Sequence, residues 1–199
     1  MFQQKPKNLF YLLVLLFFMP ICAAWYLFTY HSHWIQHTTN HGKLIQPLLP
    51  IENLTLNDYL LNRTINPNSW KNYWVMLYLK KNNCDAGCLT NIYLMGQTKK
   101  ALGKYQNQVL TAYVAIDSAP ANRPPAKLLQ EYPHTLLLKA NASMVQHFFA
   151  HYLNASNLIQ GQLFLVDPHG FVMMTYPGTV NFEDVYQDLN HLLKLEADA

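Results

Sequence analysis

An uncharged apolar segment near the N-terminus constrains the fold of this chain more than any other feature. Residues 9–28 contain no charged side chain and consist mainly of Leu, Phe, Val and Ile. A helix of about 20 apolar residues is long enough to cross the hydrocarbon core of a bilayer. The sequence therefore predicts one N-terminal transmembrane helix over residues 9–28, and the remaining chain has to fold in water.

The charges beside this segment predict its orientation. Lys5 and Lys7 precede it, and the next cation is Lys43. Because cytoplasmic flanks carry the excess of Lys and Arg, residues 1–8 are expected in the cytoplasm and the bulk of the chain outside it. A cleaved signal peptide is the alternative, since Cys22-Ala23-Ala24 offers small residues for cleavage. The length of the segment and the aromatic residues near its end favour a retained anchor; they are Trp25, Tyr26, Tyr30 and Trp34.

Residues 29–50 are polar and include Pro47 and Pro50, which predicts a juxtamembrane stalk and linker. His33, His37 and His41 recur every fourth residue, so on a helix they would share one face and could offer metal ligands. A plain polar segment is the alternative, and we favour it because residues 38–42 resemble a helix end. Residues 51–199 are then one domain, long enough to bury a core without disulfides or metals.

The pattern of apolar runs in this domain predicts alternating strands and helices. Strands are expected over 73–79, 109–116 and 135–138, with a hairpin of 162–166 and 171–176. Helices are expected over 88–102, from Asn141 or Ser143 to about residue 153, and over 181–195, and residues 117–125 should be an irregular loop. This order predicts an α/β fold with a central mixed sheet flanked by helices.

Two cysteines lie between the first predicted strand and the helix after it, where ligand and catalytic groups gather in α/β sheets. Cys84 and Cys88 are four residues apart. In a helical turn their Cα atoms would lie about 6 Å apart, so the thiols could form a disulfide or share a metal ion. The alternatives are an inert disulfide or two ordinary buried cysteines.

The start of a helix also predicts different roles for the two thiols. Backbone N–H groups there stabilise a thiolate; Lys80 and Lys81 would add to this effect and Asp85 would oppose it. Cys84 is expected to be more exposed and to act as the nucleophile, with Cys88 as the resolving thiol.

Charge excludes nucleic acid as a partner. The net charge of the 199 residues is +3, and the longest Lys/Arg runs are the pairs Lys80–Lys81 and Lys99–Lys100. A nucleic-acid interface needs a basic patch, which this distribution does not predict.

Several of these motifs together resemble the membrane-anchored thioredoxin-like proteins of the Sco/SenC type. The likeness rests on residues 40–45 with Pro47, on residues 74–79 leading into Cys84 and Cys88, and on residues 165–170. It implies a thioredoxin-like fold in a bacterial inner membrane with the domain in the periplasm. In that family two cysteines and a distal histidine bind copper. The domain delivers copper to the dinuclear copper site of cytochrome c oxidase, or reduces the cysteines of that site.

The chain departs from the family pattern at two places. The family's histidine should fall near residues 157–161, which contain none, and Asp85 and Leu89 replace the prolines that follow the cysteines. Other candidate ligands in the domain are His134, His147, His151 and His169. Since soft thiolates favour Cu(I), a two-coordinate site of Cys84 and Cys88 is also chemically sound.

Three functions follow from this reading. The first is an assembly factor for cytochrome c oxidase that hands copper to an oxidase subunit, or reduces it, through Cys84 and Cys88. The second is a general thiol-disulfide oxidoreductase for exported thiol proteins. The third is a redox-inert interaction module that has kept only the fold.

Overall fold

The computed structural model describes residues 6–30, 40–81, 84–116, 132–150, 161–176 and 180–197. The chain divides into two units, Met1–Thr39 and Asn40–Ala199, which are described separately.

The first unit contains the helix α1 (Pro6–Tyr30). Its large apolar side chains between Phe10 and Tyr26 are exposed. Among the described residues, no helix combines the length and the apolarity that crossing a membrane requires. The transmembrane helix over residues 9–28 therefore stays a prediction.

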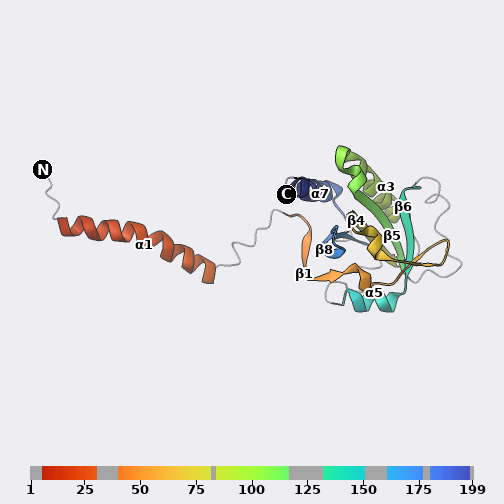
Figure 1. Ribbon diagram of the computed structural model, residues 1–199, viewed down its shortest axis with the longest axis horizontal. Coiled ribbons are helices and arrows are strands. Elements are labelled where there is room, and N and C mark those ends of the chain that lie inside the picture. Colours follow the sequence, from red (N-terminus) through yellow and green to blue (C-terminus); the bar gives the residue numbers. More distant parts are fainter. Residues whose placement is uncertain are drawn as a thin grey trace. The chain divides into compact units, whose positions relative to one another are not determined.

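The second unit is built on one eight-stranded mixed sheet in the order β1-β8-β7-β4-β5-β6-β2-β3 (Figure 1). The parallel strands β4, β5 and β6 lie next to one another, and β4 also pairs with β7 in the antiparallel sense. The strands are β1 (Lys43–Pro50), β2 (Leu56–Asp58), β3 (Thr64–Ile65), β4 (Trp74–Lys81), β5 (Val109–Ile116), β6 (Thr135–Ala140), β7 (Gln162–Val166) and β8 (Phe171–Tyr176).

Both faces of this sheet are covered, which explains why β4 reads as a continuous apolar run. Trp74, Met76 and Tyr78 pack in one core with residues of α3 (Ala86–Ala101) and α7 (Phe182–Ala197). Val75, Leu77 and Leu79 pack in the other core, which includes residues of α5 (Ala142–Phe148). The short 3₁₀ helices among the described residues are η1 (Ile51–Asn53), η2 (Pro67–Trp70) and η3 (Gly103–Gln108).

The predicted central mixed sheet flanked by helices is confirmed. The main difference concerns residues 43–50, for which the sequence predicts a linker. They form β1 instead, and this strand pairs with β8 from Lys43↔Thr175 to Pro50↔Phe171. Prolines interrupt its apolar pattern, so the sequence does not show the strand; as an edge strand β1 tolerates them. The predicted loop over 117–125 lies outside the described residues.

Candidate functional site

The two cysteines flank the N-terminus of α3, directly after the central strand β4. Cys84 and Cys88 form a disulfide, with their Cα atoms 5.2 Å apart. The predicted spacing therefore brings both sulfur atoms together. Parallel strands carry their ligand and catalytic groups at their carboxyl ends, and this is the end of β4 that the pair follows.

The two sulfur atoms differ in how accessible their residues are. Cys88 lies inside the first turn of α3 and is 1% exposed, packed in the core beneath that helix. Cys84 precedes the helix and is half-buried. An attacking group from another protein therefore reaches Cys84 more easily than Cys88.

Asp85 sets the electrostatics of this helix start. Its carboxylate caps α3 by accepting a hydrogen bond from the backbone N–H of Cys88, with a distance of 2.9 Å from N to Oδ1. The Nζ atom of Lys80, a nearly buried side chain, lies 3.2 Å from the other oxygen. The hydrogen bond from Cys88, followed by the contact with Lys80, holds the pKa of Asp85 below its ordinary value against the opposing effect of partial burial.

This arrangement changes the prediction made from charge alone. The sequence predicts that the positive charge of Lys80 favours a thiolate, but in the structure this charge is paired with Asp85. The N–H of Cys88 is also engaged by that carboxylate rather than by sulfur. The carboxylate consequently opposes thiolate formation, as expected, and weakens the contributions of the helix start and of Lys80.

A buried tyrosine of β4 lies in the same core cluster as Cys88. The Tyr78 hydroxyl accepts a hydrogen bond from Nδ2 of Asn91 on α3, at 3.0 Å. Burial raises the pKa of Tyr78, so it stays a neutral phenol. The backbone of Gly161 passes so close to this ring that a Cβ there would collide with the hydroxyl, and its φ of +90° also favours glycine. Nothing in the sequence spacing of Tyr78 or Asn91 marks them as part of the site.

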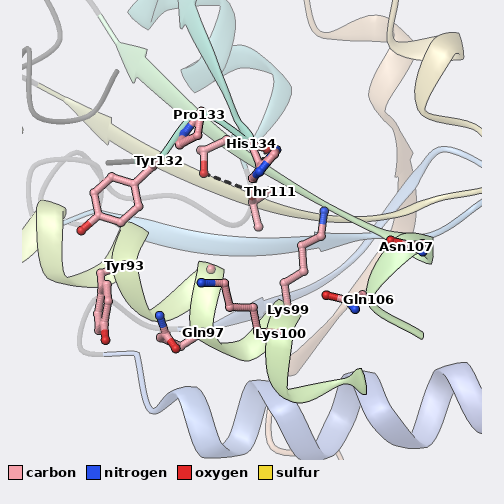
Figure 2. A pocket seen from close by; sticks show the side chains of 12 residues that line it. Tyr93, Gln97, Lys99, Lys100, Gln106, Asn107, Thr111, Tyr132, Pro133 and His134 are labelled. Carbon is pink, nitrogen blue, oxygen red and sulfur yellow. Dashed lines mark hydrogen bonds between the residues drawn. The ribbon is translucent and has the colours of Figure 1, made fainter. Parts of the chain in front are cut away.

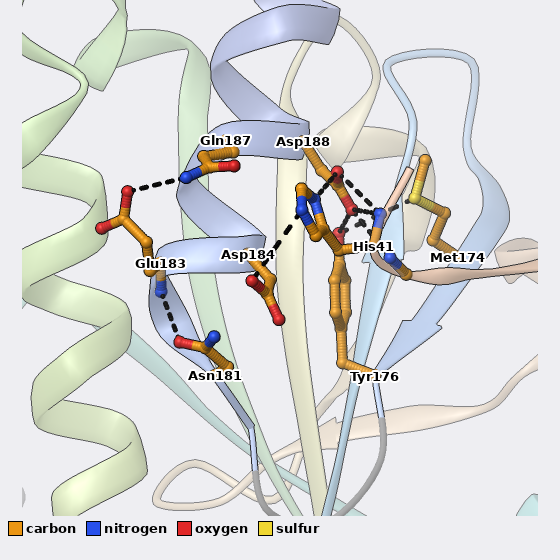
Figure 3. A network of polar contacts seen from close by, with 9 residues as sticks. His41, Met174, Tyr176, Asn181, Glu183, Asp184, Gln187 and Asp188 are labelled. Carbon is orange, nitrogen blue, oxygen red and sulfur yellow. Dashed lines mark hydrogen bonds and ion pairs between the residues drawn. The ribbon is translucent and has the colours of Figure 1, made fainter. Parts of the chain in front are cut away.

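A second polar cluster joins the start of β1 to α7 (Figure 3). Asp188 is 4% exposed, and its carboxylate accepts hydrogen bonds from the backbone N–H groups of His41 and Gly42, from the His41 ring and from the Tyr176 hydroxyl. Burial alone raises the pKa of Asp188, but these bonds together hold it below its ordinary value. The hydrogen bond to Asp188 raises the pKa of His41.

Three other candidate histidines lie on different elements of the second unit. His134 lines a cavity beside α3, His147 lies in the last turn of α5, and the exposed His169 ring lies 3.9 Å from Asp167 in the turn between β7 and β8. His33, His37 and His151 lie outside the described residues. In the part of the chain that the structure describes, no three His, Cys, Asp or Glu side chains form a group that could hold a metal ion.

Known proteins place this arrangement in context. The family model described as "Transmembrane-like, thioredoxin-like, C-terminal domain" matches residues 74–196, more than half of the chain. No curated protein matches this chain. Copper-bound yeast Sco1 is similar in structure, with 16% identity, a TM-score of 0.54 and coverage of 79% of this chain and 94% of that chain.

Two further solved structures have the same fold. BsSco, described as having a disulfide switch and as a member of the Sco family of cytochrome c oxidase assembly proteins, is 19% identical with a TM-score of 0.53, covering 73% of this chain and 94% of that one. The thioredoxin domain of a thiol-disulfide oxidoreductase from Bacteroides vulgatus is 13% identical with a TM-score of 0.54, covering 74% and 99%. These likenesses confirm the predicted thioredoxin-like fold and the resemblance to Sco proteins.

Proposed function

Because this chain belongs to the family of transmembrane-like, thioredoxin-like C-terminal domains, we propose that it exchanges disulfides with exported thiol proteins through Cys84 and Cys88. The observation that carries the proposal is the disulfide itself, placed at the start of α3 with Cys84 more accessible than Cys88. Thiol-disulfide exchange requires access to one sulfur atom of the pair, so the greater exposure of Cys84 favours a working disulfide.

The exchange proceeds in two balanced steps. A partner thiolate attacks Sγ of Cys84, a mixed disulfide forms, and the Cys84–Cys88 bond breaks to release the Cys88 thiolate. A second partner thiolate then attacks the partner's own sulfur in the mixed disulfide and releases Cys84. Two electrons pass from the partner dithiol to the pair, both cysteine thiolates take up protons, and the partner leaves with a disulfide. The reverse sequence reduces a partner disulfide, with Cys84 as nucleophile and Cys88 as resolving thiol.

Groups near the two cysteines affect the relative stability of the disulfide and thiolate forms of the pair. The N–H groups at the start of α3 favour the released Cys88 thiolate, and the Asp85 carboxylate opposes it. The hydrogen bond from Asn91 of α3 to the buried Tyr78 of β4 helps to hold the helix against the sheet. The geometry therefore suits a pair whose reduced form is only moderately stabilised.

Copper handling is the second candidate, and the first partner to test is a subunit of cytochrome c oxidase. It is supported by the fold shared with copper-bound yeast Sco1 and with BsSco. Sulfur atoms close enough to form a disulfide can, once reduced, both reach one Cu(I) ion, which soft thiolates favour. Cys84 and Cys88 would hold this cargo, and a third ligand is not assigned.

The membrane anchor belongs to the same proposal and rests on the sequence of residues 9–28 and on their flanking charges. We propose residues 1–8 in the cytoplasm of a bacterium, residues 9–28 across its inner membrane, residues 29–39 as the juxtamembrane segment and residues 40–199 as the periplasmic domain. Resistance of the full chain to extraction from membranes by alkaline carbonate tests the anchor. Removal of the domain by protease added to spheroplasts tests whether the domain lies on the periplasmic side of the membrane.

The exchange itself is tested by trapping. In the Cys88→Ser variant, Cys84 can attack a partner disulfide but the mixed disulfide cannot be resolved, so we expect partners linked covalently to the full-length chain in its native membrane. The matched Cys84→Ser variant should trap at least tenfold less. Equal trapping by both variants would contradict the assigned roles, and no trapping by either would contradict the exchange.

A further inference from the structure

A cavity of about 400 Å³ lies beside the C-terminal half of α3, where η3 and the beginnings of β5 and β6 meet (Figure 2). This volume is within the range of pockets that bind small organic molecules. Cys88 and Lys99 are eleven residues apart on α3, which corresponds to roughly 16 Å along the helix axis. The cavity is thus separate from the disulfide.

Lys99 gives this cavity its charge. The side chain is half-buried, and Figure 2 shows it reaching from α3 towards Thr111. Its ammonium group makes no hydrogen bond or ion pair with any described residue. Burial lowers its pKa, which means that the charged form lacks compensation here. Lys100 and His134 also line the cavity, and none of the described residues that line it is an Asp or a Glu.

The rest of the lining combines neutral polar groups with an aromatic wall. Thr111 is 2% exposed, and its hydroxyl lies 3.1 Å from that of Thr135. Side-chain amides of Gln97 and Asn107 also line the cavity. Tyr93 and Tyr132 meet edge to face, with ring centroids 6.4 Å apart, on the side of the cavity near the middle of α3. Such a lining offers a cation, neutral hydrogen-bonding groups and apolar surface together.

We propose that this cavity binds a small organic anion that carries both a phosphate or carboxylate group and a ring. The anionic group pairs with Lys99 and Lys100, and the ring packs against Tyr93 and Tyr132. An anion compensates the half-buried ammonium, which the described residues leave without a partner. The site does not depend on the proposed thiol chemistry.

Phenyl phosphate is the smallest probe that carries both features. We would titrate it into the full-length chain in a zwitterionic detergent and measure heat, with inorganic phosphate and phenol as separate arms. The expected result is saturable one-to-one binding of phenyl phosphate, at least fivefold tighter than that of phosphate or phenol. Because hydrogen bonds to charged groups contribute about 1.5–3 kcal/mol, Lys99→Gln should weaken binding at least tenfold.

Lys104→Gln is the matched control, since Lys104 is exposed, lies over the Tyr105 ring and does not line the cavity. It should leave binding unchanged within twofold. An unchanged far-UV circular dichroism spectrum shows that a variant is folded. If Lys99→Gln does not fold, Lys100→Gln provides a second variant. Absence of saturable binding, equal binding of phosphate, or equal loss in Lys104→Gln would each overturn the proposal.

Discussion

Replacing Asp188 by alanine should be among the most damaging single changes in the domain. The carboxylate accepts hydrogen bonds from two buried donors, the Gly42 N–H at 2.8 Å and the Tyr176 hydroxyl at 2.9 Å. It also accepts from the N–H and the ring of His41, which is exposed enough for water to replace those bonds. Both the start of β1 and the last helix depend on this one side chain.

The magnitude follows from the donors that the change leaves without a partner. A buried donor without an acceptor costs about 1–3 kcal/mol, so the two buried donors cost about 2–6 kcal/mol together. Removing the carboxylate also removes the cost of burying it, which brings the expected loss in free energy of unfolding to about 3 kcal/mol. Urea unfolding followed by fluorescence of the buried Trp70 and Trp74 measures it.

Asp184→Ala is the matched control. Asp184 lies one turn earlier on α7, is partly exposed, and lies 4.0 Å from the His41 ring. Its removal should change the free energy of unfolding by less than about 0.5 kcal/mol. A loss below about 1 kcal/mol for Asp188→Ala, or an equal loss for both variants, would refute the reasoning.

Further predictions concern pH, packing and the thiols. The pKa of Asp188 is lowered on folding, so the stability that its charge contributes is present above about pH 4 and is lost as the pH falls through the folded pKa. In acid, the free energy of unfolding of Asp188→Ala should therefore depend less on pH than that of the unchanged protein. The pKa of His41 is raised on folding, so the stability that its charge contributes is present below about pH 6.5 and is lost as the pH rises through the folded pKa. His41→Gln should abolish this part of the pH dependence of the free energy of unfolding. Gly42→Ala places a Cβ 2.7 Å from the Tyr176 ring and should cost about 1–3 kcal/mol in urea unfolding. Asp85→Asn keeps a helix cap but removes the negative charge, so the pKa of the Cys84 thiol in the reduced protein should fall. The pH dependence of alkylation by iodoacetamide measures this pKa. An unchanged or higher pKa would contradict the role given to Asp85.

The sequence predicted the elements that combine strong local signals. The apolar run of β4, the cysteines after it and the periodic pattern of α3 are neighbours in the chain, so the strand, the disulfide and the helix follow from short-range patterns. The mixed sheet follows from the order of such elements.

What the sequence did not reveal depends on residues that meet only after folding. His41 and Asp188 are 147 residues apart in the sequence, and no local pattern links them. The cavity beside Lys99 is formed by α3, η3 and the segment before β6, so its charge is evident only from their packing. The pairing of Lys80 with Asp85 was likewise missed, because the sequence shows both charges but not the contact between them.

Disulfide transfer in vitro tests the central claim most directly. The oxidised full-length chain is mixed with a reduced dithiol peptide, and the products are quenched with acid and counted by mass spectrometry. The proposed function predicts one peptide disulfide formed for each Cys84–Cys88 pair reduced, through a mixed disulfide on Cys84. A pair that stays oxidised against excess peptide, or a mixed disulfide found on Cys88 instead, would contradict it.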